Sequence, residues 1–352
     1  MHTDAPTLSV LIVTWNEREL IERSLPRLLE QLRPQDEVIV ADNDSSDGTI
    51  DAVNRIAPAA KVIRMASNDG YMPACNAAAD LSTGDLLLTL DADAVVAPGF
   101  CDAIRLPVKD GRGWDCWMGV VTMDEGRLIN TSGGVSHFTG ISWTDQIGEP
   151  AADAPTQPGE VSFVTGVCLT TTREAWERSP GFPAEYFLYC DDVDYSWRVR
   201  LTGGRCGVEP SARVDHLYDF RRARPKWRML ERNRWATIVR TYPWELLVLV
   251  SPALLATELA ILAVSAQAGW GREKLDSYSD LVRWLPRLVR ERREIQAKRT
   301  VSAYEFARLM TPELSSPYLG RASQSRVLRV LLTAYWSAVR RALARRSDHQ
   351  AG

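Results

Sequence analysis

Two aspartates, Asp91 and Asp93, directly follow the apolar run Leu86–Leu90. In an extended segment, residues two apart project to the same side, so both carboxylates can reach one site. Carboxylate oxygens suit a hard divalent cation, which can bind a diphosphate group at the same time. An Asp-x-Asp pair alone is common, but its place after a predicted strand favours a cation site.

A second acidic cluster is formed by Asp191, Asp192 and Asp194, which follow the aromatic segment Tyr186–Tyr189. Three carboxylates within four residues repel one another, so we expect a raised pKa for at least one of them. The alternative is a solvated helix N-terminus, where the helix dipole stabilises acidic side chains. The aromatic segment favours a position beside a buried surface, and hence a functional cluster.

Polar residues also gather in the segment 42–48, Asp-Asn-Asp-Ser-Ser-Asp-Gly, and around His216. Asp, Asn, Ser and Gly are turn formers, but the length of 42–48 and its place after a predicted strand favour a binding loop over a simple turn. His216 ends another predicted strand, after the acidic cluster. A lone histidine is often structural, so that role and a metal or phosphate role both stay open.

The order of strands and helices predicts that these segments meet at one edge of a sheet. Strand-like runs at residues 8–13, 37–41, 61–63 and 85–90 alternate with helical patterns at 17–32, 49–56 and 73–81. This order predicts a mostly parallel sheet flanked by helices, and such sheets bind ligands beyond the carboxyl ends of their strands. Further along, the pattern predicts a strand over 161–169 and a helix over 191–201.

Taken in this order, the segments resemble the inverting family 2 glycosyltransferases with a GT-A fold, over roughly residues 8–220. The matching segments are Leu11–Asn16, Val40–Thr49, Asn68–Tyr71 with Ala74–Asn76, Leu90–Ala94, Phe163–Gly166, Pro180–Phe182, Phe187–Arg198 and His216. Within that family the sequence looks most like the rhamnosyltransferase branch that builds bacterial cell-envelope glycans. The resemblance implies a single Rossmann-like sheet and a metal-dependent hexosyltransferase.

The resemblance also implies roles for the polar residues on the donor side. The nucleoside pocket would be lined by Thr14, Asn16 and Asp42. The nucleotide and its sugar would be supported by Asn68 and Asn76.

The same resemblance implies a cation site and a catalytic base. Asp91 would face the sugar, Asp93 would be the more direct ligand of Mg²⁺ or Mn²⁺, and His216 would approach the metal or the diphosphate. Asp192 would be the general base that takes the proton of the acceptor hydroxyl, with Asp191 beside it.

Two positions depart from the family pattern. Asp191 stands where Glu is commoner, which leaves open whether it or Asp192 faces the acceptor. Pro180 replaces the first glycine of the usual Gly-Gly before Phe182, which bears on the geometry of that loop.

The charge of the chain is divided unevenly along its 352 residues. Residues 1–220 hold 34 acidic and 17 basic residues, whereas residues 221–352 hold 11 acidic and 25 basic residues, although the net charge is only −3. A composition of 45% hydrophobic and 25% charged residues excludes collagen, low-complexity disorder and a small disulfide scaffold. We therefore expect a catalytic domain at 1–220 and a basic helical extension at 221–352.

The extension contains a 21-residue segment, Leu246–Ala266, with a single charge at Glu258. As a helix it is about 31 Å long, near the thickness of a bilayer's hydrocarbon core. Pro252 and Glu258 weaken a clean span, so a full crossing, an interfacial hairpin and a helix packed on the catalytic domain stay open. The preceding stretch Arg221–Arg240 has eight basic residues and several tryptophans nearby, which favours anionic headgroups.

Two further segments, 281–289 and 326–346, are basic and amphipathic, and this pattern predicts helices that lie in a membrane interface. In the second segment one face holds Leu328, Leu331, Leu332, Tyr335, Trp336, Val339 and Leu343. Formation of a homodimer through these faces is the alternative. No nucleic-acid readout motif accompanies the basic helices, so we expect no nucleic-acid partner.

These observations predict a cytoplasmic, metal-dependent inverting glycosyltransferase at the inner face of the plasma membrane. Its donor would be a nucleotide sugar, with rhamnose favoured, and its acceptor a glycan or polyprenyl-linked molecule of cell-envelope polysaccharide synthesis. Six scattered cysteines without a Cys-x-x-Cys pair indicate reduced thiols and a cytosolic setting. The competing class is a non-catalytic nucleotide-sugar-binding protein with the same fold.

Overall fold

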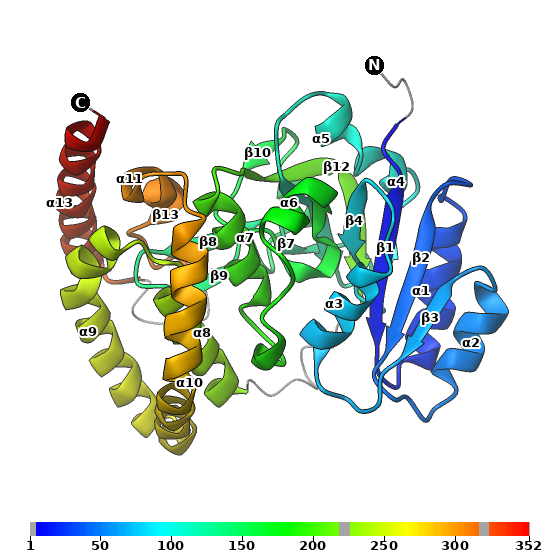
Figure 1. Cartoon of the computed structure of the whole chain (residues 1–352), viewed down its shortest axis with the longest axis horizontal. Coiled ribbons are helices and arrows are strands. Elements are labelled where there is room, and N and C mark those ends of the chain that lie inside the picture. Colours follow the sequence, from blue (N-terminus) through cyan, green and yellow to red (C-terminus); the bar gives the residue numbers. More distant parts are fainter. Residues whose placement is uncertain (1–4, 218–225, 317–323, 352) are drawn as a thin grey trace. The chain divides into compact units, whose positions relative to one another are not determined.

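The first four strands of a ten-stranded sheet lie parallel to one another (Figure 1). They are β1 (Leu8–Thr14), β2 (Glu37–Asp42), β3 (Lys61–Arg64) and β4 (Leu86–Thr89), in the spatial order β3-β2-β1-β4. All residues of β1 and β4 are buried, as expected for strands covered on both faces. In this computed structural model the described residues are 5–217, 226–316 and 324–351.

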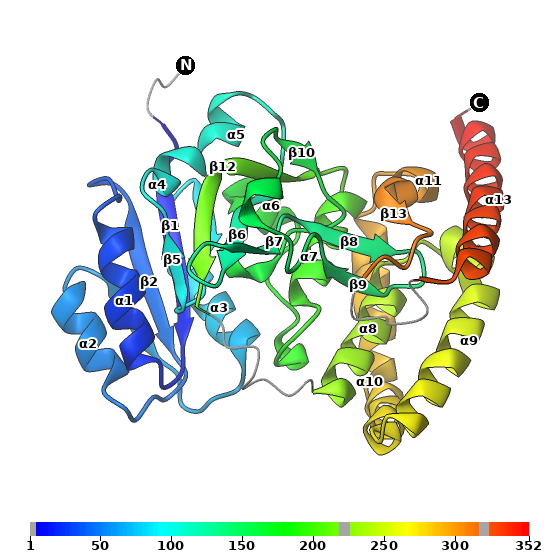
Figure 2. The ribbon, with the colours of Figure 1, turned by 180° about the vertical axis from the view of Figure 1, so that it is seen from behind.

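Three helices connect these strands, namely α1 (Arg18–Leu29), α2 (Thr49–Ile56) and α3 (Tyr71–Asp80). The apolar residues of α1 recur at helical spacing and are buried at Ile21, Leu25 and Leu28. Helices α1 and α2 lie on one face of the strands and α3 on the other (Figures 1 and 2). The winding therefore reverses between β1 and β4, which is where doubly wound sheets bind ligands. The predicted alternation of strands and helices is confirmed.

The second half of the sheet is mixed. Its long strands β6 (Cys116–Met123) and β12 (Cys206–His216) are parallel to each other, and β11 (Thr170–Thr172) runs antiparallel to β4 and β6. Strand β12 also pairs antiparallel with β5 (Ala94–Val96), in a register that sets His216 opposite Ala94. This pairing brings a residue from late in the chain to the end of β4.

Shorter elements complete the sheet and its surroundings. The remaining strands of this sheet are β7 (Leu128–Thr131) and β10 (Gly159–Glu160). The helices between the strands are α4 (Phe100–Ala103), α5 (Leu106–Lys109), α6 (Arg173–Arg178) and α7 (Asp191–Leu201). Helices α2 and α7 have the bounds that the sequence pattern predicted.

Residues 161–169 do not form the predicted strand. Phe163 forms one isolated bridge with Gly134, Gly166–Cys168 is a 3-10 turn, and a paired strand follows only at Thr170–Thr172. The N–H of Asp91 donates to the carbonyl oxygen of Val167 over 3.1 Å, so the bent segment lies against the end of β4. Most of its apolar residues are buried, and a short buried segment has the same sequence pattern whether it is extended or bent.

The C-terminal part of the chain, from residue 226 onward in the described residues, forms a second compact unit. Two earlier segments, Val135–Trp143 and Arg200–Gly203, belong to the same unit. Its helices are α8 (Trp227–Thr241), α9 (Trp244–Gln267), α10 (Gly271–Ala297), α11 (Ala303–Phe306) and α13 (Arg326–Ala351). A three-stranded sheet has the order β13 (Met310–Thr311), β8 (Gly134–His137), β9 (Ser142–Thr144). The predicted boundary at 220/221, and residues 221–225 of the predicted basic stretch, lie outside the described residues.

The stripe of α13 that was expected to face lipid is largely packed within this second unit. Its buried members are Trp336, Val339 and Leu343. The Trp336 ring stacks on Phe138 with 4.8 Å between ring centroids, while Leu331 remains 62% exposed. The amphipathic pattern of 326–346 therefore reflects intramolecular packing, because a buried protein face and a lipid face have the same helical period.

The close pairing of β6 with β12 yields a stability prediction at Gly119. A Cβ added to Gly119 would meet the carbonyl oxygen of Ala212 at 2.3 Å, because the register of β12 shifts between Glu209 and Arg213. We expect Gly119→Ala to lower the free energy of unfolding by about 1–3 kcal/mol through overpacking. Urea unfolding followed by tryptophan fluorescence measures this change.

The matched control is Gly159→Ala, since a Cβ at Gly159 has no atom within 4 Å. We expect this control to change the free energy of unfolding by less than about 0.5 kcal/mol. Equal effects of the two substitutions would show that the β6–β12 contact does not require glycine.

Candidate active site

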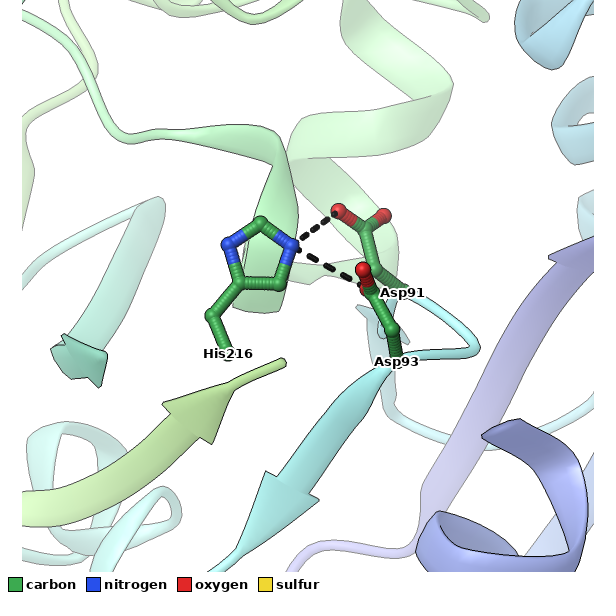
Figure 3. Close-up of side chains that lie close together, drawn as sticks. All are labelled: Asp91, Asp93 and His216. Carbon is green, nitrogen blue, oxygen red and sulfur yellow. Dashed lines mark ion pairs between the residues drawn. The ribbon is translucent and has the colours of Figure 1, made fainter. Parts of the chain in front are cut away.

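Asp91, Asp93 and His216 point toward one another beyond the end of β4 (Figure 3). The Nε2 atom of His216 lies 3.1 Å from Oδ1 of Asp93 and 3.9 Å from Oδ2 of Asp91. One ligand atom from each residue lies within 4.8 Å of the others. The structure therefore brings together Asp93 and His216, which were predicted for the cation, and Asp91, which was predicted to face the sugar.

The electrostatics of this cluster are those of carboxylates that share a confined site. Burial, with the Asp93 carboxylate beside it, raises the pKa of Asp91 to about 6. Burial lowers the pKa of His216, but the hydrogen bond and charge of Asp93 outweigh burial and leave that pKa above its ordinary value. Without a cation, the proton on His216 supplies the positive charge that the two carboxylates require.

The donor set fits a small divalent cation. Two carboxylates and one imidazole are ligands that Mn²⁺ accepts, and carboxylates alone suit Mg²⁺. The other ring nitrogen of His216, Nδ1, lies 3.5 Å from Oδ1 of Asn130. Metal-bound histidines commonly place such an oxygen behind the ring, which keeps the ring in one orientation.

The acidic cluster at the start of α7 separates into three different environments. Asp194 is fully buried and forms a 2.7 Å ion pair with Arg198, so its charge is compensated. Asp191 is buried, and burial together with Asp192 raises its pKa well above the ordinary value. Asp192 is partly exposed, and burial raises its pKa to about 6. The expectation of at least one raised pKa in this cluster agrees with these environments.

Asp192 accepts hydrogen bonds from two backbone groups. The N–H of Val193 donates to its Oδ1 over 2.7 Å, and the N–H of Gly166 also stabilises the carboxylate and lowers its pKa. The negative charge of Asp91 contributes to the raised pKa of Asp191, and the negative charge of Asp192 contributes to the raised pKa of Asp91. The two predicted acidic clusters therefore face the same edge of the sheet.

The backbone before α7 holds these aspartates in an unusual geometry. Phe187, Tyr189 and Cys190 all have positive φ angles, of 65°, 72° and 62°. The carbonyl oxygen of Phe187 accepts from the N–H of Tyr71 at the start of α3 over 3.1 Å. A Cβ at Gly70 would lie 2.8 Å from Phe187, so glycine at position 70 permits this close approach.

The residues predicted for the nucleoside join the ends of β1 and β2. The Oδ1 of Asn16 accepts from the N–H of Ser46 over 2.8 Å. Asp42 is fully buried, and its Oδ2 accepts from the N–H of Ser45 over 2.9 Å. Thr14 is buried one strand away, and its carbonyl oxygen accepts from the N–H of Asn43 over 2.9 Å. These bonds order the loop 42–48, whereas its contact with a nucleoside stays a prediction.

The two asparagines predicted on the donor side have local partners. The Oδ1 of Asn68 accepts from the N–H of Gly70 over 3.2 Å. Asn76 binds the backbone of Phe182 twice, since its Oδ1 accepts from the N–H over 2.7 Å and its Nδ2 donates to the carbonyl oxygen over 2.9 Å. Asn76 therefore positions the loop that precedes α7, and direct contact with the donor stays a prediction for both residues.

Two groups near the acidic edge were not predicted from the sequence. Burial, with Asp93 and Asp91 nearby, raises the pKa of Glu17 to about 7. The hydroxyl of Tyr71 is buried near Asp91 and Asp191, and burial raises the pKa of Tyr71 well above the ordinary value. Glu17 begins the helical pattern predicted over 17–32, shortly after the strand predicted over 8–13, and that proximity to a strand end is the available signal. No local pattern indicated Tyr71.

The family described as "Glycosyl transferase family 2" matches residues 9–140. The match includes Asp91 and Asp93 and ends before Asp192 and His216.

Curated relatives cover more of the chain. The N-acetylglucosaminyl-diphospho-decaprenol L-rhamnosyltransferase of Mycobacterium tuberculosis is 26% identical over 238 residues, which are 59% of this chain and 75% of the relative. The poly-beta-1,6-N-acetyl-D-glucosamine synthase of Staphylococcus aureus is 25% identical over 213 residues, which are 58% of this chain. The match spans about half of the synthase, 48% of its length.

Solved structures show the same GT-A fold. A crystal structure of GalNAc-T7 with UDP, GalNAc and Mn²⁺ has a TM-score of 0.58 at 15% identity, and covers 78% of this chain and 55% of that chain. Staphylococcus aureus TarS has a TM-score of 0.56 at 15% identity, over 83% of this chain and 53% of that chain. The mannosyltransferase PcManGT of Pyrobaculum calidifontis, with GDP-Man and Mn²⁺, has a TM-score of 0.50 at 22% identity, over 87% of each chain.

The raised pKa values of His216 and Asp91 predict that the cation affinity of this site depends on pH. Below the raised pKa of His216 and the pKa of about 6 of Asp91, protons occupy the groups that a cation needs. We expect the affinity for Mn²⁺ alone to rise roughly tenfold or more between about pH 5.5 and about pH 7, as these protons leave. Isothermal titration calorimetry at several pH values measures this dependence.

Asp93→Asn should weaken Mn²⁺ binding at all these pH values, because it removes a charged ligand. The matched control is Asp102→Asn, an acidic residue of α4 whose side chain is 75% exposed. Loss of binding in both variants, or in neither, would contradict a cation site at the end of β4.

Proposed function

We propose that this chain, which carries a family 2 glycosyltransferase domain, transfers a sugar from a nucleotide-diphosphate donor to an acceptor hydroxyl with inversion of the anomeric carbon. The observation that supports this most is the placement of Asp91, Asp93, His216 and Asp192 at one edge of the sheet. A single displacement needs a stabilised leaving group on one side of the sugar and a base on the other. The two acidic clusters offer these two functions.

On the donor side, we assign Asp93 and His216 to the cation and Asp91 to the sugar and the diphosphate. A bound Mg²⁺ or Mn²⁺ supplies positive charge that stabilises the departing diphosphate. The carboxylates hold that charge in place, and the Asn130 oxygen behind His216 supports the orientation of its ring. Thr14, Asn16, Asp42, Asn68 and Asn76 are proposed to hold the nucleotide and sugar, directly or through the loops that they order.

On the acceptor side, Asp192 is the better base of the two neighbouring aspartates. It is partly exposed and has a pKa of about 6, so it is largely ionised at neutral pH and still accepts a proton readily. Asp191 is buried with a pKa raised well above the ordinary value, so it is more often protonated there. We propose that Asp191 positions the turn and adjusts the proton affinity of Asp192.

For substrates, we propose rhamnose as the sugar and a glycan or polyprenyl-linked molecule as the acceptor, in cell-envelope polysaccharide synthesis. The Mycobacterium relative, whose name describes rhamnosyl transfer to a diphospho-decaprenol acceptor, supports this choice. Such an acceptor places the enzyme at the cytoplasmic face of the plasma membrane, with 1–220 as catalytic domain and 221–352 as the membrane-associated part. A homodimer is compatible with this arrangement.

A donor screen tests the choice of sugar. Ligands that bind only the native state raise the melting temperature, so the donor should stabilise the protein in the presence of Mn²⁺. We expect the largest shift in a panel of nucleotide sugars with TDP-rhamnose. A larger shift with another sugar nucleotide would overturn the choice of rhamnose. No shift with any would contradict donor binding, and a shift without any transfer activity would favour the non-catalytic nucleotide-sugar-binding protein.

The base assignment is tested by Asp192→Asn. The amide keeps the shape of the side chain but cannot take the acceptor proton, so turnover should fall by about 10²–10⁴-fold while donor binding is retained. A radiolabelled transfer assay, with donor binding by calorimetry, separates the two effects.

The matched control is Glu177→Gln, an exposed residue of α6. Its turnover should equal that of the wild type. Near-normal turnover of Asp192→Asn would move the base elsewhere, with Asp191 as the next candidate.

A further inference from the structure

Helix α9 has a long exposed face without charge. Along its 24 residues the most exposed large apolar side chains are Trp244 (65%), Val248 (48%), Leu255 (63%), Leu259 (59%) and Val264 (55%). Trp244, Val248, Leu255 and Leu259 are four, seven and four residues apart, close to whole helical turns, so these four share one side of the helix. Val264 is exposed on a different side, near the C-terminal end of the helix. By length and composition the helix could cross a membrane. The contacts of α9 with its neighbouring helices therefore have to be compared with a crossing.

At one edge of this exposed face, next to the buried Leu254, Glu258 binds α9 to its neighbours. The Glu258 carboxylate forms an ion pair with Arg234 of α8 over 2.6 Å and with Lys274 of α10. It also accepts hydrogen bonds from Tyr278 of α10 over 2.5 Å and from the indole N–H of Trp235 over 2.8 Å. These partners hold the pKa of Glu258 low, at about 2, despite its partial burial.

The partners of Glu258 are themselves buried in this second unit. The side chain of Lys274 is fully buried and that of Arg234 is 5% exposed, and both also pair with Glu231 of α8. Two acids and two bases thus form one buried, compensated network. Removing any member leaves one charge of opposite sign without compensation away from water, which is unfavourable.

This network is incompatible with a helix that crosses the bilayer. Glu258 is the fifteenth of the 24 residues of α9, so a crossing places it near the bilayer centre. Its partners could follow only if α8 and α10 entered the lipid as well, and 12 of the 27 residues of α10 are charged. If α9 crossed alone, Glu258 would lose all four partners, and charged groups are unfavourable within the hydrocarbon core.

We infer that α9 is an in-plane anchor that inserts its uncharged face into one leaflet of an anionic bilayer and does not cross it. The inference rests on the membrane location proposed above and is independent of the glycosyl transfer chemistry. In this arrangement the contacts of Glu258 fix which face of α9 meets the lipid.

Charge on the neighbouring helix favours an anionic bilayer over a second copy of this chain. On α10 the exposed apolar side chains are Leu275, Val282, Leu285 and Val289. The exposed arginines at 272, 283 and 290 line one edge of this apolar stripe at helical spacing. Basic side chains beside an apolar stripe suit anionic headgroups, whereas two copies meeting through this face would bring like charges together.

The first experiment tests the exposed face. We expect the double substitution Leu255→Glu and Leu259→Glu to weaken binding to vesicles of equal parts phosphatidylglycerol and phosphatidylcholine by about tenfold or more in flotation assays. The matched control replaces Leu81 and Val108 by Glu, two exposed apolar residues of the first unit at 48% and 41% exposure. Binding unchanged by the α9 pair, or weakened equally by the control pair, overturns the inference.

The same variants distinguish this inference from the proposed function. Turnover of the α9 double variant on a water-soluble acceptor should equal that of the wild type. Vesicle binding without any transfer activity in the wild type would leave the anchor standing and refute the transferase. If the double variant loses self-association in analytical ultracentrifugation and not vesicle binding, the face is a dimer contact and the anchor is refuted.

The second experiment measures depth. Ala256 is exposed near the middle of α9, and a fluorophore is attached there through Ala256→Cys, in a protein that also carries Cys190→Ser. Its fluorescence is measured in vesicles whose lipids carry a quencher at different depths along the acyl chain. An in-plane helix gives strongest quenching from shallow positions, within about 5–10 Å of the headgroup boundary. Strongest quenching from the ends of the acyl chains, at the bilayer centre, would show a crossing helix and overturn the inference.

Glu258→Leu gives an independent readout of the buried network. If α9 crossed the bilayer, removing its internal charge would strengthen vesicle binding. For an in-plane helix fixed by Glu258, the substitution leaves Arg234 and Lys274 with one acid between them, so the melting temperature in solution falls and vesicle binding does not increase.

Discussion

Mutual repulsion between carboxylates is the constraint that the first unit has to satisfy. Asp91, Asp93, Asp191 and Asp192 lie at one edge of a sheet, and burial raises the pKa of three of them. Protonated His216 and backbone N–H groups stabilise the remaining charge. Asp93 and His216 would hold a divalent cation in such a site, and the cation would supply positive charge in place of a proton and toward a diphosphate. The raised proton affinities and the capacity for cation binding thus have one origin.

Much of this edge follows from local patterns in the sequence. Strand ends, the turn-rich segment 42–48 and the bounds of α7 are local features, and the structure agrees with them. The approach of His216 to Asp93 is different, since it depends on the antiparallel pairing of β12 with β5. The bend at residues 161–169 and the use of Asn76 to hold Phe182 are likewise long-range. Periodicity reports burial of a residue but not the partner against which it is buried.

The basic residues of the second unit have two different environments, which the uneven charge of the sequence alone did not distinguish. Part of its basic excess is internal, because Arg234 and Lys274 neutralise Glu231 and Glu258 in a buried network. Other arginines pair with acids at helix contacts, such as Arg228 with Asp280 over 2.6 Å. A basic composition alone would suggest a uniformly charged surface. The structure instead separates charges that fix helix packing from those that remain exposed beside apolar stripes.

The central claim is a single displacement between a cation-bound diphosphate and the base Asp192. Nuclear magnetic resonance of the product of the first turnover, with a donor of known anomeric configuration, tests it most directly. The account predicts a product whose anomeric configuration is opposite to that of the donor, because the acceptor attacks from the face away from the diphosphate. A product that retains the donor configuration would contradict it, since retention requires a different arrangement of groups around the sugar.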